Sequence, residues 1–137
     1  ALNDERKCKF GSAHVNLSAY YNRTGAADKA LEYANKAIEL EPQSDRAWFQ
    51  KAKAQERLGH LDAAVDSLTR AISFNTRASS YYYVLAGLYR RLGKMKDSQE
   101  ALDVFTRLEK ETSKLDRMRR SAAKSPGSVP PPGEQRE

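Results

Sequence analysis

Few residues of this chain are of the types that perform catalysis or hold a metal. The 137 residues include one cysteine, Cys8, and two histidines, His14 and His60, which are 46 positions apart. Structural zinc sites usually draw on four cysteine and histidine ligands, so this set predicts no metal. The sequence also has no phosphate-binding loop, dinucleotide fingerprint or paired-carboxylate motif. We therefore expect no enzymatic activity and no cofactor.

Cations and aromatic rings are the remaining side chains with binding chemistry. The chain has 24 Lys and Arg against 18 Asp and Glu, a formal net charge of +6. The excess is spread thinly except over residues 113–120. Nucleic-acid-binding domains usually show a stronger bias, so nucleic acid is not the expected partner. The tyrosines at 81–83 near Arg90 and Arg91 keep an RNA-associated scaffold open as an alternative.

Composition limits the class of protein and its compartment. Hydrophobic residues make up 39% and charged residues 31%, which is typical of a chain that folds. The longest apolar run, Tyr81 to Tyr89, is nine residues, well below the ~20 that span a bilayer. A single cysteine favours a reducing compartment such as the cytoplasm. The start at Ala1 is typical of a processed or expressed fragment.

A 34-residue repeat organises the chain and must position these side chains. Gly25, Gly59 and Gly93 are each 34 residues apart. Apolar residues recur at spacings of three and four on both sides of each glycine, which predicts amphipathic helices and no strands. In the same phase lie two sets of small residues and one of large apolar residues: Ser18, Ala52 and Ala86; Ala30, Ala64 and Ser98; Leu40, Phe74 and Leu108.

The expected helices form three antiparallel pairs, with a glycine in the turn of each pair. Ser44 is expected to cap the third helix. The last helix keeps its apolar phase through Leu115 and Met118 and is longer than its counterparts. Residues 1–10 match no unit and are interpreted as a leader or the remnant of a preceding helix. Residues 121–137 are predicted to form a disordered Pro-rich tail. The predicted helices are 12–24, 27–40, 45–58, 61–74, 79–92 and 95–119.

These residues resemble the tetratricopeptide repeat family, most clearly at residues 82–93 of the third unit. The resemblance implies an all-α fold, a right-handed superhelical array of three helix pairs. The repeats would cover 11–44, 45–78 and 79–112 within a domain of 11–120. Phe105 replaces the small residue that the family places there. This departure is interpreted as a terminal unit whose long helix, extended to about 120, caps the exposed end of the array.

The family resemblance also implies a function, the binding of a peptide or partner protein in a concave groove lined by the first helix of each pair. The side chains expected to line this groove include several cations but only one acid, Glu56, together with a few apolar residues. We therefore expect a ligand with acidic and apolar side chains. Small Ala19 and Gly87 leave room for a ligand backbone. The candidate groove residues are Val15, Asn16, Asn22, Arg23, Phe49, Gln50, Lys53, Arg57, Tyr83, Val84, Arg90 and Arg91.

Several alternatives and finer expectations accompany this interpretation. The chain could be the regulatory or docking end of a larger enzyme, or could self-associate through an exposed repeat end. Of the tyrosine run, Tyr82 is expected in the core, Tyr83 toward the groove and Tyr81 at an edge. Lys114, Arg117 and Arg120 are interpreted as a solubilising cap. Some family members clamp the acidic tails of heat-shock chaperones, but the clamp positions here are Val15, Ala19, Gln50, Ser80 and Val84, so that ligand is not expected.

Overall fold

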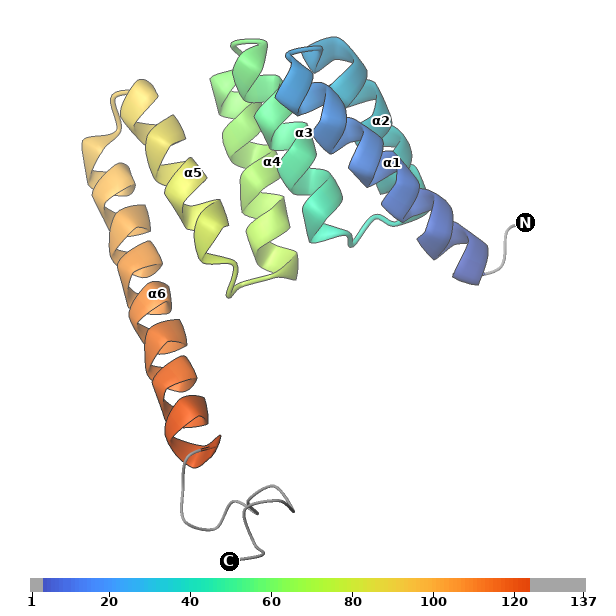
Figure 1. Ribbon diagram of the computed structural model, residues 1–137. Coiled ribbons are helices and arrows are strands. Elements are labelled where there is room, and N and C mark those ends of the chain that lie inside the picture. Colours follow the sequence, from blue (N-terminus) through green and yellow to red (C-terminus); the bar gives the residue numbers. More distant parts are fainter. Residues whose placement is uncertain (1–3, 124–137) are drawn as a thin grey trace, which may run out of the picture.

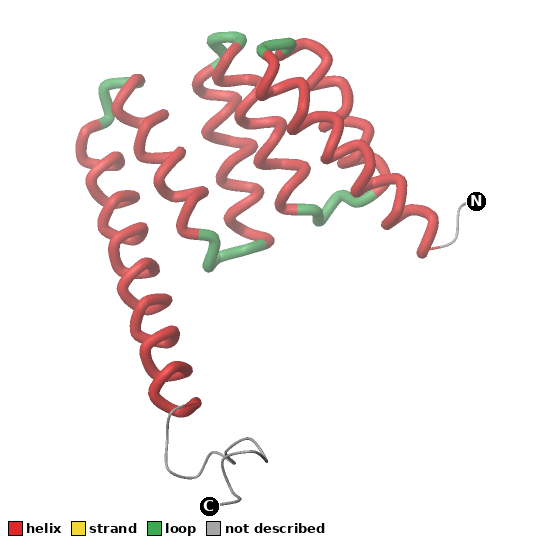
Figure 2. The backbone as a smooth tube through the Cα atoms, in the orientation of Figure 1, coloured by secondary structure: helices red, strands yellow, loops and turns green. Residues whose placement is uncertain are grey.

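Six helices in three antiparallel pairs make up the fold of the computed structural model, which describes residues 4–123 (Figure 1). The pairs stack side by side in a curved row, and short loops join the helices (Figure 2). The described residues contain no strand, so the all-α prediction is confirmed. The helices are α1 (Asp4–Thr24), α2 (Ala27–Leu40), α3 (Asp45–Arg57), α4 (Leu61–Phe74), α5 (Ser79–Arg91) and α6 (Met95–Ala123).

The turn inside each pair has the same geometry three times. Gly25, Gly59 and Gly93 adopt φ values of +91°, +84° and +77°, the left-handed conformation that side chains disfavour. Each first helix is closed by a backbone hydrogen bond from the residue after the glycine to a carbonyl five residues earlier. The donors and acceptors are Ala26 to Tyr21, His60 to Gln55 and Lys94 to Tyr89, at 2.8–2.9 Å.

Small residues let the two helices of each pair approach closely. In the first pair the buried Ser18 hydroxyl donates to the carbonyl of Ala30 across 2.6 Å. In the third pair the direction is reversed, because Ser98 donates to the carbonyl of Ala86 across 2.8 Å. The second pair has buried alanine at both positions, Ala52 and Ala64. The contact thus stays dense without leaving a buried hydroxyl unpaired.

Both ends of the array differ from the predicted boundaries. The first helix begins at Asp4 and not at residue 12, so residues 4–10 belong to it. Gly11 does not end a helix; a Cβ at this position would lie 2.6 Å from the Glu41 carboxylate, so glycine permits a close approach. The last helix continues to Ala123, which makes residues 121–123 helical. Residues 124–137 of the expected tail lie outside the described part.

The junction between the second and third pairs is built around Tyr81. Its ring stacks on Phe49 with centroids 4.6 Å apart, and its hydroxyl donates to Asp45 across 2.6 Å. Tyr81 is 6% exposed and Tyr83 is 60% exposed, whereas Tyr82 is half-buried. The expected order of the first two tyrosines was therefore wrong. The core stripe of α5 runs through Leu88 and Leu85 at helical spacing, and Tyr81 continues it.

Replacing Tyr81 with phenylalanine is expected to lower stability by about 1.5–3 kcal/mol, because the hydrogen bond to a carboxylate is lost while the ring is kept. Burial raises the pKa of Tyr81, and the hydrogen bond to Asp45 raises it further. The raised pKa favours the folded state up to about pH 10, and that contribution is lost as pH rises further. Urea denaturation should show the deficit at pH 7 and a flatter alkaline decline for Tyr81→Phe. If Tyr81→Phe and the wild type were equally stable at pH 7, the hydrogen bond to Asp45 would not contribute to stability.

Candidate functional site

A recess of about 440 Å³ lies between α1 and α3. Its six lining residues all occupy positions that the sequence assigned to the groove, and none is acidic. Three of them are cations contributed by two different repeats, so the array places positive charge along one surface. The lining residues are Ala19, Asn22, Arg23, Gln50, Lys53 and Arg57.

Two hydrogen bonds position the floor of this recess. Asn22 is 4% exposed, and its Nδ2 donates to the backbone carbonyl of Gln50 across 3.1 Å and to the Gln50 side-chain oxygen across 2.9 Å. Both residues were expected to contact a ligand. In the structure the Asn22 amide is not directed at a ligand. It forms hydrogen bonds that link α1 to α3 and orient the Gln50 side chain.

The groove cations are unequal in their surroundings. Arg23 and Arg57 are exposed, whereas Arg91 forms an ion pair with Glu56 across 3.3 Å. The Lys53 ammonium lies 5.5 Å from the centroid of the Phe49 ring. Glu56 partly compensates the charge of Arg91, whereas Arg23, Lys53 and Arg57 line the same recess and none of its lining residues is acidic.

Several predicted apolar contacts of the groove belong instead to the core. Val15 is 2% exposed and packs in a cluster with Ala37 and Ala47, so its assignment to the groove was wrong. Phe49 and Val84 are half-buried and pack against the main core cluster. Phe49 is covered by Tyr81 of the next pair, and Val15 is covered by Ala37 of its own pair and Ala47 of the next one; periodicity does not reveal such covering. Asn16 remains exposed and accepts from Arg46 across 3.2 Å.

A second recess, of about 190 Å³, lies where α5 meets α6. Tyr83, Gly87 and Arg90, which the sequence analysis placed on the groove positions, line it. Ser98 and Leu102 of α6 also line it; both were missed because the groove positions were sought only on the first helix of each pair. Phe105 marked this place in the sequence as the departure from a small residue, and its ring centroid lies 5.4 Å from that of Tyr83.

Metal and membrane chemistry gain no support from the described residues. Residues 4–123 hold no group of three or more histidine, cysteine, aspartate or glutamate side chains placed to bind a metal ion. None of the six helices is long and apolar enough to cross a membrane.

Comparison with known sequences identifies the repeat. Two tetratricopeptide repeat family models match the chain, at residues 12–54 and 45–76. The chain is 41% identical over 70 residues to the human zinc finger CCCH domain-containing protein 7B, matching 51% of this chain and 7% of that protein. It is 47% identical over 67 residues to an uncharacterized protein of Methanocaldococcus jannaschii, matching 44% of this chain and 78% of that protein. This chain therefore spans a small part of its human relative.

Comparison with solved structures agrees with the observed fold. MamA superposes with a TM-score of 0.69 at 26% identity, over 72% of this chain and 57% of that one. The second tetratricopeptide domain of Spaghetti (RPAP3), solved with an HSP90 peptide, superposes with a TM-score of 0.72 at 15% identity. That match covers 77% of this chain and 96% of the other. With its 34-residue period, three glycine turns and paired helices, this chain belongs to the tetratricopeptide repeat family.

Proposed function

We propose that the recess between α1 and α3 binds an extended peptide segment of a partner protein, with acidic side chains and an apolar anchor. The repeats make the chain a protein-interaction module, and modules of this family are generally not enzymes. The observation that carries the proposal is the convergence of Arg23, Lys53 and Arg57 on a recess with no acidic lining residue.

Physical chemistry favours an acidic ligand over a neutral one at this place. Cations near one another repel, and a carboxylate placed among them relieves that repulsion while forming charge-assisted hydrogen bonds. Arg57 is exposed and Lys53 half-buried, so a ligand can reach them. The apolar part of the ligand would contact Tyr83, farther along the array. Tyr83 is 60% exposed.

The solved structure of the Spaghetti domain supports the use of this fold for an acidic segment, since its peptide has the sequence SRMEEVD. The chemistry must differ here. The family's clamp positions hold Val15, Ala19, Gln50, Ser80 and Val84, none of which is a cation. We therefore place the charge recognition on Lys53 and Arg57 and expect no preference for a free carboxyl terminus.

Selection from a displayed library of random peptides tests the proposal. We expect enrichment of peptides that combine aspartate or glutamate with a large apolar residue, whether or not the carboxyl terminus is free. Binding of the enriched peptides should weaken as salt rises, because screening reduces steering. Enrichment of basic or uncharged peptides would contradict the proposal.

A further inference from the structure

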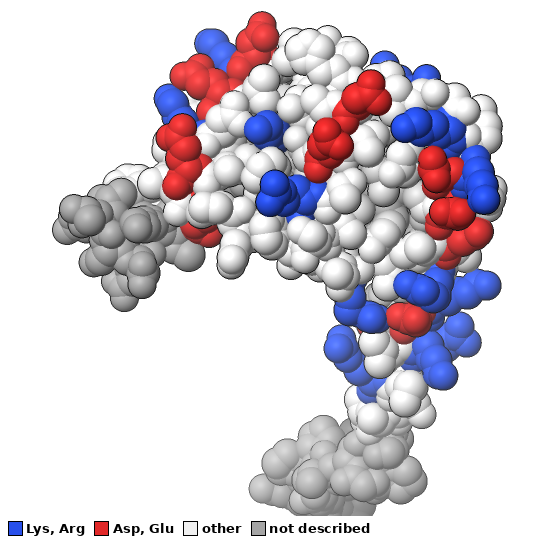
Figure 3. All heavy atoms as spheres, turned by 180° about the vertical axis from the view of Figure 1, so that it is seen from behind, with Lys and Arg blue, Asp and Glu red and all other residues white. Residues whose placement is uncertain are grey.

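The last helix continues well past the helix it packs against. We call residues 112–123 of α6 the α6 extension. Its 12 residues are all helical, which corresponds to a length of about 18 Å. Figure 1 shows the extension standing beyond the end of α5, and Figure 3 shows it projecting from the array in the opposite view.

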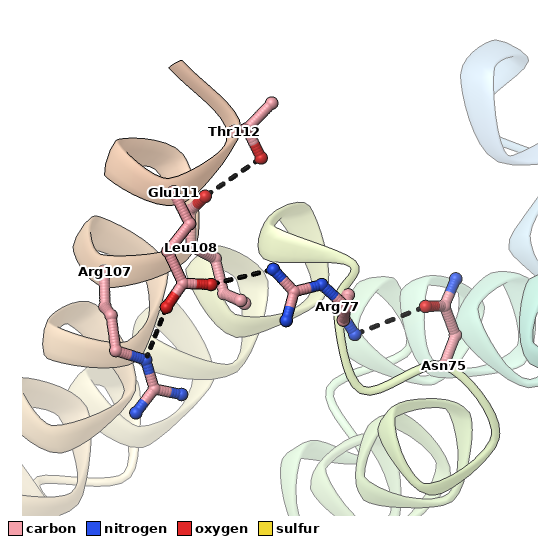
Figure 4. Close-up of polar contacts among 6 residues, drawn as sticks. All are labelled: Asn75, Arg77, Arg107, Leu108, Glu111 and Thr112. Carbon is pink, nitrogen blue, oxygen red and sulfur yellow. Dashed lines mark hydrogen bonds and ion pairs between the residues drawn. The ribbon is translucent and has the colours of Figure 1, made fainter. Parts of the chain in front are cut away.

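A polar cluster holds the base of the extension in place (Figure 4). Glu111 accepts a hydrogen bond from Arg77, in the loop before α5, across 2.7 Å. The Arg107 guanidinium lies 4.0 Å from the other oxygen of the same carboxylate. Nearby, Ser79 donates to Glu109 across 2.5 Å. The contacts of Arg77 and Ser79 join α6, just before the extension, to the start of α5 and the loop that precedes it.

The apolar face of α6 does not end where its partner helix ends. Ala101 and Leu108 are 6% and 4% exposed, because the rest of the third repeat covers them. Leu115 and Met118 continue the same face at spacings of seven and three residues. They are 48% and 57% exposed. The apolar face that packs against α5 nearer the start of α6 is therefore exposed to solvent at Leu115 and Met118.

Positive charge lies at both margins of this uncovered face, where Lys114 and Arg119 flank Leu115 and Met118, while Arg117 and Arg120 lie on the opposite side of the helix. The extension carries Lys114, Arg117, Arg119 and Arg120 against Asp116, a net charge of +3. Asp116 lies 4.0 Å from Arg119 in an ion pair. All four cations are exposed, and Figure 3 shows blue side chains gathered on this part of the molecule.

We propose that the α6 extension docks an acidic amphipathic helix of a partner protein, with the apolar side of that helix on Leu115 and Met118. The partner helix would lie along the line that α5 would follow if it were longer. Acidic residues at its margins would meet Lys114 and Arg119, which flank the apolar face. A second copy of the chain is disfavoured, because two extensions of charge +3 repel each other. Two exposed apolar side chains are fewer than an interfacial membrane helix uses.

A synthetic helical peptide tests this surface. The probe has about 18 residues, with leucines at spacings of three and four on one face and glutamates at the margins of that face. Fluorescence anisotropy with the full chain should show binding. Leu115→Gln with Met118→Gln, and separately Lys114→Glu with Arg119→Glu, should each weaken it at least about tenfold. Glutamine and glutamate favour helix, so circular dichroism should show unchanged helicity.

Matched controls separate this surface from the groove and from other occupants. Lys53→Glu with Arg57→Glu should leave the Leu115-dependent binding of the probe unchanged, and so should Lys94→Glu with Lys96→Glu beside the start of α6. The proposal is overturned if a scrambled probe of equal composition binds the groove variant as well as the helical probe does, or if the groove variant alone abolishes binding of the helical probe. It is also overturned if the wild type does not bind the probe. Leu115-dependent binding to phosphatidylserine vesicles, or a dimer that Leu115→Gln and Met118→Gln dissolve, would assign the surface to a membrane or a second copy instead.

Discussion

Reversing Lys53 and Arg57 to glutamate together is expected to weaken an acidic peptide selected by the wild-type groove by about 100-fold, roughly tenfold for each reversed charge. Both side chains line the recess between α1 and α3, so each reversal replaces an attraction with a repulsion at the same place. The fold should persist, because Arg57 is exposed and Lys53 half-buried. Titration calorimetry at two salt concentrations measures the effect, which should shrink at the higher salt.

The control for this experiment needs two cations on the outer helices. Lys36 pairs with Glu32 on α2, and Arg70 lies over the Trp48 ring from α4. Lys29, another cation on α2, is unsuitable as a control because it lines a separate recess together with Arg57. Lys36→Glu with Arg70→Glu should change peptide affinity less than about threefold, the level of nonspecific field effects. An equal loss in both double variants would show that net charge, and not the recess, governs binding.

Deleting residues 102–137 is expected to cost about 5 kcal/mol or more and to abolish cooperative folding of the third pair. The deletion removes Leu102 and Leu108, which pack against the rest of the repeat, and each large apolar side chain typically contributes about 2–5 kcal/mol. A repeat without its second helix has no other surface on which to bury its apolar face. Urea denaturation followed by circular dichroism should show the loss as a lower midpoint and a broader transition.

Deleting residues 112–137 should behave differently. This truncation ends just after Glu111 and keeps its contact with Arg77, so stability should change by less than about 1 kcal/mol. The comparison separates the part of α6 that completes the third repeat from the α6 extension. If both truncations destabilise the array alike, the extension is a structural cap and the docking proposal loses its basis.

The sequence period determined which parts of the fold could be predicted. It located five of the helices closely, since the glycines end the first helix of each pair in every unit. The resemblance to the tetratricopeptide repeat family implied groove positions that include the six residues lining the recess, and the binding role of these residues stays a prediction. The errors at Val15 and Tyr81 share a physical origin. Periodicity gives the face on which a side chain lies, but the cover over that face comes from a neighbouring unit and depends on the packing between units.

Gly11 shows a second limit of sequence analysis. The predicted first helix began at residue 12 because residues 1–10 match no repeat unit, and Gly11 gave no reason to extend it. The helix continues because the absent side chain leaves room for Glu41. The contact joins residues thirty positions apart, so local sequence does not report it. The ion pair of Arg91 with Glu56 was missed for the same reason.

The serine contact inside the helix pairs also has an evolutionary consequence. The first pair carries serine on its first helix, Ser18, and the third carries it on its second helix, Ser98; each donates to the opposite backbone. The second pair has alanine at both places. One arrangement can therefore become the other through two single substitutions, with the alanine pair as a viable intermediate. Mutational drift can therefore move the serine hydroxyl from one helix of a pair to the other without passing through an unstable ancestor. Repeats that descend from one duplicated unit can differ at these two positions and still keep the same packing of their helix pair.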